Sequence, residues 1–409
     1  MVDVPFPNFP SGPPSGGLGA VYPKMLESRG KAILLLAANG RSQPYSLESA
    51  RMNEPLKVAV AGLGRMGTVH ALHVHELARD THECELAAVA EIDIEHARRF
   101  IAEIGRPVPI FPSIEELAKA DVCDATVIVT PTDKHREHAT LTIAAGHRVL
   151  LEKPLTGTLE ADREFAAELD RDHPHSLMLA FQRRFDEPLQ YAKQLMESGA
   201  IGRVFKIYSA LEDSNPAPNG YRSGGILPDM SVHNVDEILW LTGRIPSKAL
   251  AIGSRIYSHA LTTCVEDFDD ALLYLWFEND LIAQVQVSRN HVSGYRVETI
   301  IFGEQGQIHV GHFEQKPFEI VVEAYGRRGR AEPLAYRKFP MRNYGRELPE
   351  FVDRFGAAYK AEVAAFIECC KAKAPFPTTH RDGVRAQEAI SAGMRATIGP
   401  EQAAPVEFS

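Results

Sequence analysis

The chain has 409 residues, of which 44% are hydrophobic and 24% charged, and its formal net charge is −10. This length is enough for two or three domains, and the apolar share allows each domain a core. The acidic balance excludes the basic surface of a nucleic-acid-binding protein. No apolar run approaches the roughly 18 residues of a membrane span, so we expect no membrane partner.

The five cysteines show neither a CxxC pair nor the spacing of a zinc site. Cys123 lies in an apolar run and is interpreted as a buried core residue. This cysteine usage favours a reducing compartment, so we expect a cytoplasmic protein.

The N-terminal region differs in composition from the rest of the chain. It begins MVDVPFPNFPSGPPSGG, is rich in Pro, Gly and Ser, and has no periodic apolar pattern. We therefore assign residues 1–55 to an irregular N-terminal extension. At Met52 the sequence becomes MNEPLKVAVAGLGRMG. We expect the true start there, with the first 51 residues an upstream translation or a dispensable arm.

From Leu56 to about Leu179, short β-branched runs alternate with amphipathic stretches. The predicted strands are LKVAVAG, CELAAVAE, ATVIVT and HRVLLEK, and the predicted helices begin at RMGTVHALH, IEHARRF and DKHREHA. Strands that alternate with helices form right-handed βαβ units and a parallel sheet covered on both faces. Residues 56–180 are therefore predicted to form an α/β Rossmann domain.

After Phe181 consecutive strands replace this alternation. They are VFKIYSALED, SKALAIGSRIYS, FDDALLYLWFEND, LIAQVQVSRNHV, YRVETIIFG and GQIHVGHF. Strands without long crossovers predict a large, open and mostly antiparallel sheet, flanked by helices at 187–202, 229–243 and 351–372. Residues 181–409 are thus predicted to form an α+β domain for substrate binding and oligomerisation. A partner usually covers such a face, so we expect a homodimer or homotetramer.

A G-x-G-x-x-G motif, Gly62, Gly64 and Gly67 around Arg65 and Met66, joins the first predicted strand to the first helix. In that context the glycines permit a tight turn, close approach of the backbone to a pyrophosphate, and helix–sheet packing. A glycine-rich turn without a ligand is the alternative interpretation.

Glu91 ends the second predicted strand, and no Arg or Lys follows it immediately. A carboxylate there can accept the adenosine ribose hydroxyls and would repel a 2′-phosphate, which favours NAD over NADP. Glu152, Lys153 and Pro154 end a later strand in LLEKPL. Open α/β sheets bind ligands at the carboxyl ends of their strands, so Lys153 is expected near the nicotinamide and a substrate oxygen.

Asp229, His233 and Asp236 are spaced i, i+4 and i+7 in GGILPDMSVHNVDEILW. At about 3.6 residues per turn their side chains point within about 60° of one another. Two acids and an imidazole on one stripe predict a polar site, and a solvated helix face is the alternative. His233 can accept a hydroxyl proton, and Asp229 can orient it or bind substrate. Zinc normally recruits more His or Cys than this stripe offers, so we expect no metal.

Together, Gly62–Gly67, TPTDKHREHA, LLEKPL and the D-x-x-x-H-x-x-D stripe resemble the glucose–fructose oxidoreductase, inositol dehydrogenase and MocA (Gfo/Idh/MocA) family. The resemblance covers about residues 55–397 and is strongest to the inositol dehydrogenases. It implies an NAD-dependent dehydrogenase with Lys153 between nicotinamide and substrate, His233 as acid/base and Asp229 as its partner.

The resemblance also implies roles for residues around this centre. Asp236 would bind a ring hydroxyl, and Gln182 and Arg183 would lie near the substrate at the domain junction. The residues expected to line the cofactor site are Thr130, Pro131, His135, Glu152 and Lys153. The chain departs from the family at Glu91, where Asp is usual, and at Asn234, where inositol dehydrogenases often have Asp.

We therefore expect NAD-dependent oxidation of a secondary hydroxyl of a cyclic polyol, myo- or scyllo-inositol, to the ketone. One alternative is the same chemistry on another sugar, such as L-glucose or levoglucosan. Others are an oxidoreductase that never releases its cofactor and a non-catalytic NAD-binding regulator.

Overall fold

A computed structural model describes residues 54–213, 224–255, 268–291, 294–311, 319–327, 332–342, 350–399 and 402. Residues 1–53 of the predicted extension, the expected start at Met52 and Cys264 lie outside these ranges. Within them, no helix is long and apolar enough to cross a membrane.

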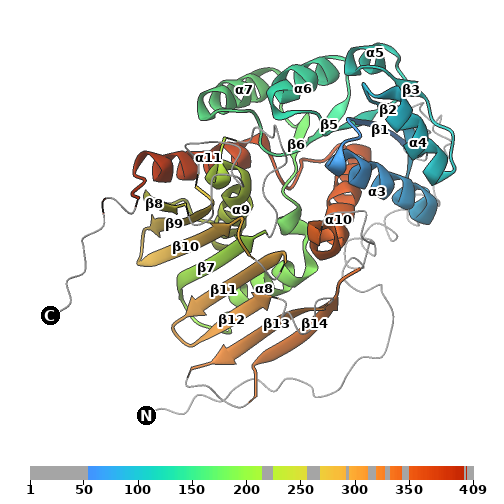
Figure 1. Cartoon of the computed structure of the whole chain (residues 1–409). Helices are drawn as coiled ribbons and strands as arrows, with labels where there is room; N and C mark the ends of the chain where they lie inside the picture. Colours follow the sequence, from blue (N-terminus) through green and yellow to red (C-terminus); the bar gives the residue numbers. More distant parts are fainter. Residues whose placement is uncertain are drawn as a thin grey trace, which may run out of the picture. The chain divides into compact units, whose positions relative to one another are not determined.

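The first part of the described chain is built on a six-stranded parallel sheet with the order β3-β2-β1-β4-β5-β6 (Figure 1). Its strands are β1 (Leu56–Ala61), β2 (Cys84–Ala90), β3 (Ile110–Phe111), β4 (Ala125–Ile128), β5 (Arg148–Leu151) and β6 (Leu177–Leu179). The predicted parallel sheet is confirmed. The strand order reverses between β1 and β4, and such a switch point is where sheets of this type bind ligands.

Helices connect these strands. They are α3 (Arg65–Thr81), α4 (Ile94–Ile104), α5 (Ile114–Lys119), α6 (His135–Ala144) and α7 (Leu159–Asp172). Local signals fix their first residues: the side chains of Asp93, Ser113 and Thr158 each accept a hydrogen bond from a main-chain N–H of the first turn. Helix α3 has no such side-chain cap, which leaves its first N–H groups available to another acceptor.

The second part is built on an eight-stranded sheet with the order β14-β13-β12-β11-β7-β10-β9-β8. Its strands are β7 (Val204–Glu212), β8 (Lys248–Ser254), β9 (Asp270–Phe277), β10 (Leu281–Ser288), β11 (Arg296–Gly303), β12 (Gly306–Gly311), β13 (Glu319–Gly326) and β14 (Ala335–Pro340). Only the β7–β10 pair is parallel among the pairs described. The predicted mostly antiparallel sheet is confirmed, and β13 and β14 extend it beyond the predicted strands.

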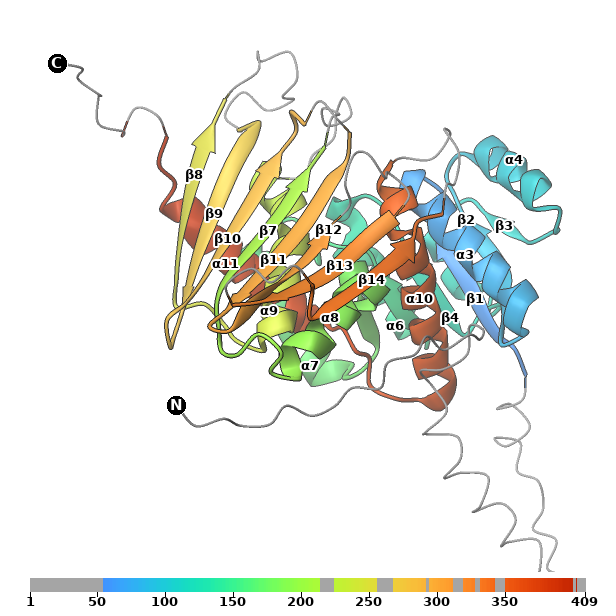
Figure 2. The ribbon, with the colours of Figure 1, turned by 90° about the horizontal axis from the view of Figure 1, so that it is seen from below.

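Alternating burial along several strands gives this sheet two different faces. In β9 and β10 every second residue is buried, as expected when one face carries the core. The helices against this face are α8 (Glu187–Glu197), α9 (Val232–Thr242) and α11 (His380–Arg395) (Figure 2). Helix α11 was not singled out in the sequence. The opposite face carries half-buried side chains such as Tyr274 and Trp276, which stack on each other.

Helix α10 (Glu350–Ala372) follows β14 in the chain and packs back on the part of the fold built on the first sheet. It packs against α3 and against η2 (Gln182–Phe185), a short turn directly after β6. Arg354 of α10 forms a buried bidentate ion pair with Asp186, with distances of 2.7 and 2.9 Å. On its other flank, Lys360 donates to Glu76 of α3 at 2.9 Å. Charge pairs therefore fix how α10 lies against α3 and against the residue that follows η2.

Glu362 lies on the buried side of α10 and is 0% exposed. Burial raises its pKa well above the ordinary value, and the nearby Glu152 and Asp236 carboxylates act in the same direction. The neutral acid is therefore the favoured form in the folded protein.

We predict that Glu362→Gln stabilises the protein, and more so at higher pH. The folded state binds a proton that the unfolded chain releases above about pH 4.3, so the contribution of Glu362 to stability falls as pH rises from there toward the raised folded pKa. Glutamine has no such loss. We expect a gain of at least about 1 kcal/mol at pH 8 and a smaller gain at pH 5, measured by urea unfolding. Exposed Glu368 on the same helix provides the control, Glu368→Gln. A gain independent of pH would contradict this interpretation.

Candidate functional site

The glycine turn after β1 has a geometry that only glycine accommodates at two positions. Gly62 has φ +87°, and a Cβ atom there would lie 2.7 Å from the Val129 carbonyl oxygen. A Cβ at Gly67 would lie 1.9 Å from the Gly62 carbonyl oxygen. These glycines bring the first turn of α3 close to the ends of β1 and β4, as the motif predicts.

The space beside Gly64 fits the pyrophosphate of a dinucleotide. An added Cβ at Gly64 would meet nothing within 4 Å, so packing does not require glycine there and a ligand can approach the backbone. The first turn of α3 has no acidic residue and no side-chain cap. Its N–H groups, from Arg65, Met66 and Gly67, can therefore bind an anion. The Arg65 guanidinium lies 5.5 Å from the Phe351 ring centroid, where the aromatic face stabilises its charge.

Glu91 follows the last residue of β2 and binds the glycine turn after β1. Its carboxylate accepts hydrogen bonds from the main-chain N–H of Leu63 at 2.6 Å and of Asp93 at 2.9 Å. Since a carboxylate has about four acceptor positions, it can still accept a ribose hydroxyl. Ile92 beside it is 89% exposed and offers an apolar surface to a base. Sequence reasoning did not assign Ile92 a role, because its exposure depends on the strand ending at Ala90.

Thr130, Pro131 and His135 follow β4, but they differ in solvent exposure. Thr130 is half-buried and Pro131 is exposed, while His135 is only 2% exposed. The His135 ring lies 2.7 Å from the Pro154 carbonyl and 2.9 Å from the Thr130 carbonyl. Burial is the main influence and lowers its pKa, although both carbonyl contacts oppose it. His135 thus connects the loops after β4 and β5, and its ring is enclosed instead of lining a surface.

Glu152 at the end of β5 is held from α3. Its Oε1 lies 2.9 Å from Nε2 of His70, and its Oε2 accepts the main-chain N–H of Lys153 at 3.0 Å. His70 is 0% exposed, and sequence reasoning gave it no role because its partner lies 82 residues away. The pair joins the helix of the glycine motif to the residue before the predicted catalytic lysine.

Lys153 reaches from the Rossmann sheet to the second domain. Its Nζ lies 3.5 Å from Oδ1 of Asp229 and 3.2 Å from the Asp229 carbonyl oxygen. Oδ2 of Asp229 accepts a hydrogen bond from Nη2 of Arg289 at 3.0 Å. Sequence reasoning did not identify Arg289, which lies inside the predicted strand LIAQVQVSRNHV; in the structure β10 ends at Ser288, directly before it. The structure thus brings Lys153 and Asp229 together, as predicted, and adds a second cation.

His233 lies at the start of α9, one turn after Asp229. The segment before it, η3 (Leu227–Ser231), is a π-helical turn. Nδ1 of His233 is buried and has no hydrogen-bond partner among the described residues. Burial lowers the pKa of His233 well below its ordinary value, and the positive charges of Lys153 and Arg183 act in the same direction. The ring is therefore neutral and able to accept a proton.

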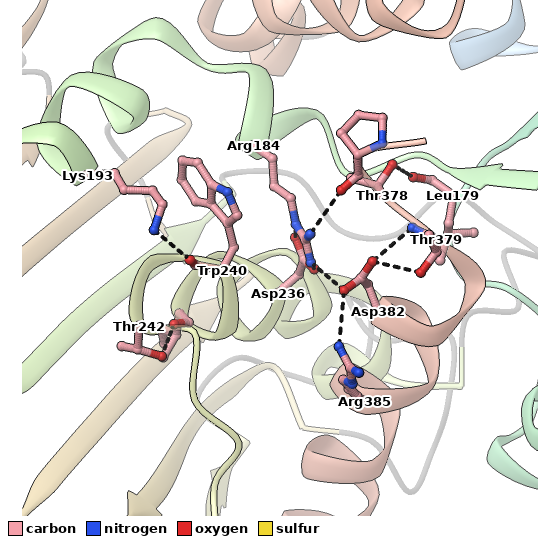
Figure 3. A network of polar contacts seen from close by, with 12 residues as sticks. Leu179, Arg184, Lys193, Asp236, Trp240, Thr242, Thr378, Thr379, Asp382 and Arg385 are labelled. Carbon is pink, nitrogen blue, oxygen red and sulfur yellow. Dashed lines mark hydrogen bonds and ion pairs between the residues drawn. The ribbon is translucent and has the colours of Figure 1, made fainter. Parts of the chain in front are cut away.

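Asp236 does not join Lys153 and Asp229 as the predicted stripe requires. Both of its oxygens accept hydrogen bonds from Arg184, at 2.5 and 2.9 Å, and Arg184 also pairs with Asp382 of α11 at 3.1 Å (Figure 3). Burial raises the pKa of Asp236 to about 6, against the effect of Arg184. The physical reason for the difference is the π-helical turn, which changes the angle between Asp229 and the regular helix. Asp236 thus holds α9 through its pair with Arg184, and its role toward a ring hydroxyl stays a prediction.

Gln182 and Arg183 lie at the domain junction, as predicted, but both are buried at 3% and 1% exposure. Nη1 of Arg183 donates to Glu237 of α9 at 2.7 Å, a buried ion pair. Arg183 therefore acts on His233 through its charge. Asn234 is also interior, donating to Ser209 of β7 at 2.7 Å, so its difference from the family concerns packing. No group of three or more His, Cys, Asp or Glu in the described ranges is arranged to hold a metal.

Comparison with known families assigns both parts of the chain. Residues 56–179 match the oxidoreductase family with an NAD-binding Rossmann fold, and residues 189–309 match the GFO/IDH/MocA C-terminal domain. Together these matches cover more than half of the chain, and they agree with the boundary between the two sheets.

Individual relatives match over nearly their whole length. Inositol 2-dehydrogenase of Arthrobacter sp. (strain FB24) is 27% identical over 86% of this chain and 97% of its own. The scyllo-inositol 2-dehydrogenase (NAD(+)) of Bacillus subtilis (strain 168) is 28% identical over 87% of this chain and 97% of its own. The crystal structure of scyllo-inositol dehydrogenase from Lactobacillus casei with bound NAD(H) and scyllo-inositol has a TM-score of 0.69 and 26% identity, covering 84% of this chain and 97% of that one. The chain therefore belongs to the GFO/IDH/MocA family of oxidoreductases, with NAD as the cofactor of its Rossmann domain.

Proposed function

We propose that this protein oxidises one secondary hydroxyl of a cyclic polyol, myo- or scyllo-inositol, to the ketone with NAD as hydride acceptor. The observation that carries the proposal is the contact of Lys153 with Asp229, and it is supported by the effect of the Lys153 charge on the pKa of His233. The names of the inositol dehydrogenases above support the substrate class. A panel of myo-inositol, scyllo-inositol, L-glucose and levoglucosan, followed by NADH absorbance, tests it.

The residues proposed to hold the cofactor surround the turn after β1. The first N–H groups of α3 bind the pyrophosphate, and Glu91 accepts the adenosine ribose hydroxyls with Ile92 against the base. Thr130, Pro131 and Glu152 lie at the ends of β4 and β5, where the nicotinamide half is expected. When bound, NAD supplies the carbon that accepts hydride, and the protein supplies binding, orientation and electrostatics.

His233 is proposed to take the proton of the reacting hydroxyl. Its Nδ1 is buried, so we assign Nε2 as the reacting nitrogen. Nε2 has a lone pair to accept the proton only when the ring is neutral. Lys153 stabilises the alkoxide that develops as the proton leaves, a task suited to a preorganised cation shielded from water. Asp229 holds Lys153 in place, and in the reverse direction protonated His233 returns the proton.

We also infer a cytoplasmic homo-oligomer that uses the face of the eight-stranded sheet opposite α8, α9 and α11. The half-buried aromatic side chains of Tyr274 and Trp276 on that face support this inference, because aromatic residues are enriched in protein–protein interfaces.

Lys153→Ala and His233→Ala are each expected to lower kcat at least about a hundredfold, because each removes a group that acts on the reacting hydroxyl. NAD affinity, measured by calorimetry, should change little. Lys193→Ala on α8 provides the control. That lysine donates to the Trp240 and Leu241 carbonyls at the C-terminal end of α9, whereas His233 lies at the start of this helix. Near-normal turnover in either catalytic variant would refute the role assigned to that residue.

Turnover is expected to persist at mildly acidic pH. The base must be neutral, and the pKa of His233 lies well below its ordinary value of 6.5, so kcat/KM should fall only when pH drops below 6.5. Inositols do not titrate in this range, so the acid limb of a pH–rate profile reports the enzyme. An acid limb at or above pH 6.5 would show that a different group accepts the proton.

Glu91→Gln is expected to weaken the preference for NAD over NADP at least about tenfold, because it removes like-charge repulsion of the 2′-phosphate. The measurement is the ratio of kcat/KM for the two cofactors. Glu95→Gln, at an exposed acid on α4, should leave that ratio unchanged. An unaltered ratio in Glu91→Gln would mean that another group excludes NADP.

A further inference from the structure

Arg289 holds the carboxylate on which Lys153 depends. Its main-chain N–H donates to the Asp269 carbonyl at 2.9 Å, which fixes the residue at the end of β10. Its guanidinium Nη2 then donates to Oδ2 of Asp229 at 3.0 Å. The side chains of Arg289, Asp229 and Lys153 are only 10%, 11% and 16% exposed, so their charges interact more strongly than surface pairs do.

Asp229 lies between two cations, and its contact with Arg289 is the closer one. Oδ2 is 3.0 Å from Arg289, whereas Oδ1 is 3.5 Å from Nζ of Lys153. A guanidinium is also the better partner for a carboxylate, since its donors lie in a fixed plane. The carboxylate is thus held more closely by Arg289 than by the lysine.

The main-chain N–H of Asp229 donates to the Gly225 carbonyl at 3.1 Å, which restrains the backbone but does not set the direction of the carboxylate. Asp229 lies on a π-helical turn that follows Gly224 and Gly225, both with positive φ. Without Arg289, the contact with Lys153 would remain, and the carboxylate could move toward that lysine. A shorter Lys153–Asp229 ion pair would cancel the positive charge at the place where the alkoxide forms.

We propose that Arg289 is a positioning residue of the active site. By holding Asp229, it keeps the charge of Lys153 directed at the substrate oxygen. This inference rests on the role proposed for Lys153 and adds a residue that the motifs of the family resemblance do not include.

The test compares wild type, Arg289→Met, Arg289→Lys and Arg203→Met with scyllo-inositol or the best polyol of the panel. Arg203, in an exposed ion pair with Glu304, is the matched control. We expect Arg289→Met to lower kcat at least about tenfold, because a displacement of 1 Å can lower a rate about a hundredfold. The KM for NAD should stay within about twofold, since Arg289 does not touch the glycine turn. Arg289→Lys should recover part of kcat, and Arg203→Met all of it.

A double-mutant cycle separates positioning from mere structural support. In an Asp229→Asn background, Arg289→Met should have little further effect on kcat, because the charge that it positions is already absent. An equal loss in both backgrounds would overturn the proposal.

Crystal structures give a readout that does not depend on the substrate. In Arg289→Met the distance from Nζ of Lys153 to the nearest Asp229 carboxylate oxygen should shorten from 3.5 Å to about 2.8 Å. An unchanged distance would overturn the inference even if the wild type oxidised no polyol. A shortened distance in an enzyme inactive on every polyol would instead support the inference and reject the proposed substrate class.

Discussion

The contact between Lys153 and Asp229 joins the two sheets at the place where the chemistry is proposed. Lys153 ends a strand of the Rossmann sheet, and Asp229 lies on the turn before α9, which packs on the other sheet. Charges this poorly exposed are tolerated only when each is compensated. Asp229 meets that requirement for Lys153 and Arg289 together, and the positive charge of Lys153 suits a reaction that develops negative charge on oxygen.

The same positive charges set the state of the base. Lys153 and Arg183 both lower the pKa of His233, in addition to burial, which keeps its ring neutral but makes it a weaker proton acceptor. General-base catalysis is most efficient when the pKa of the base is near the working pH. The lysine offsets this weakness, because it lowers the energy of the alkoxide that the base must help to generate. The proposed function of His233 as base therefore depends on the positive charge of Lys153, which both lowers the pKa of the base and stabilises the alkoxide.

The sequence predicts what local rules determine. Gly62 and Gly67 could be assigned because a turn between strand and helix imposes their geometry, and Lys153 because strand ends in such sheets face the ligand. The stripe through Asp236 assumed a regular helix, which the π-helical turn at 227–231 breaks. His70 and Arg289 could not be found from spacing, because their partners lie 82 and 60 residues away. Their roles depend on which strands become neighbours.

Charged residues of η2 and of the position after it pair with three helices, α9, α10 and α11, and so fix where these helices lie. Arg183 pairs with Glu237 of α9, Arg184 with Asp236 of α9 and Asp382 of α11, and Asp186 with Arg354 of α10. Buried ion pairs add little net stability compared with apolar packing, but a misaligned pair is strongly unfavourable. An apolar junction would tolerate sliding of α9, whereas these pairs permit one position. Since His233 lies one turn before Asp236 and Glu237, the charges that hold this junction also place the proton acceptor.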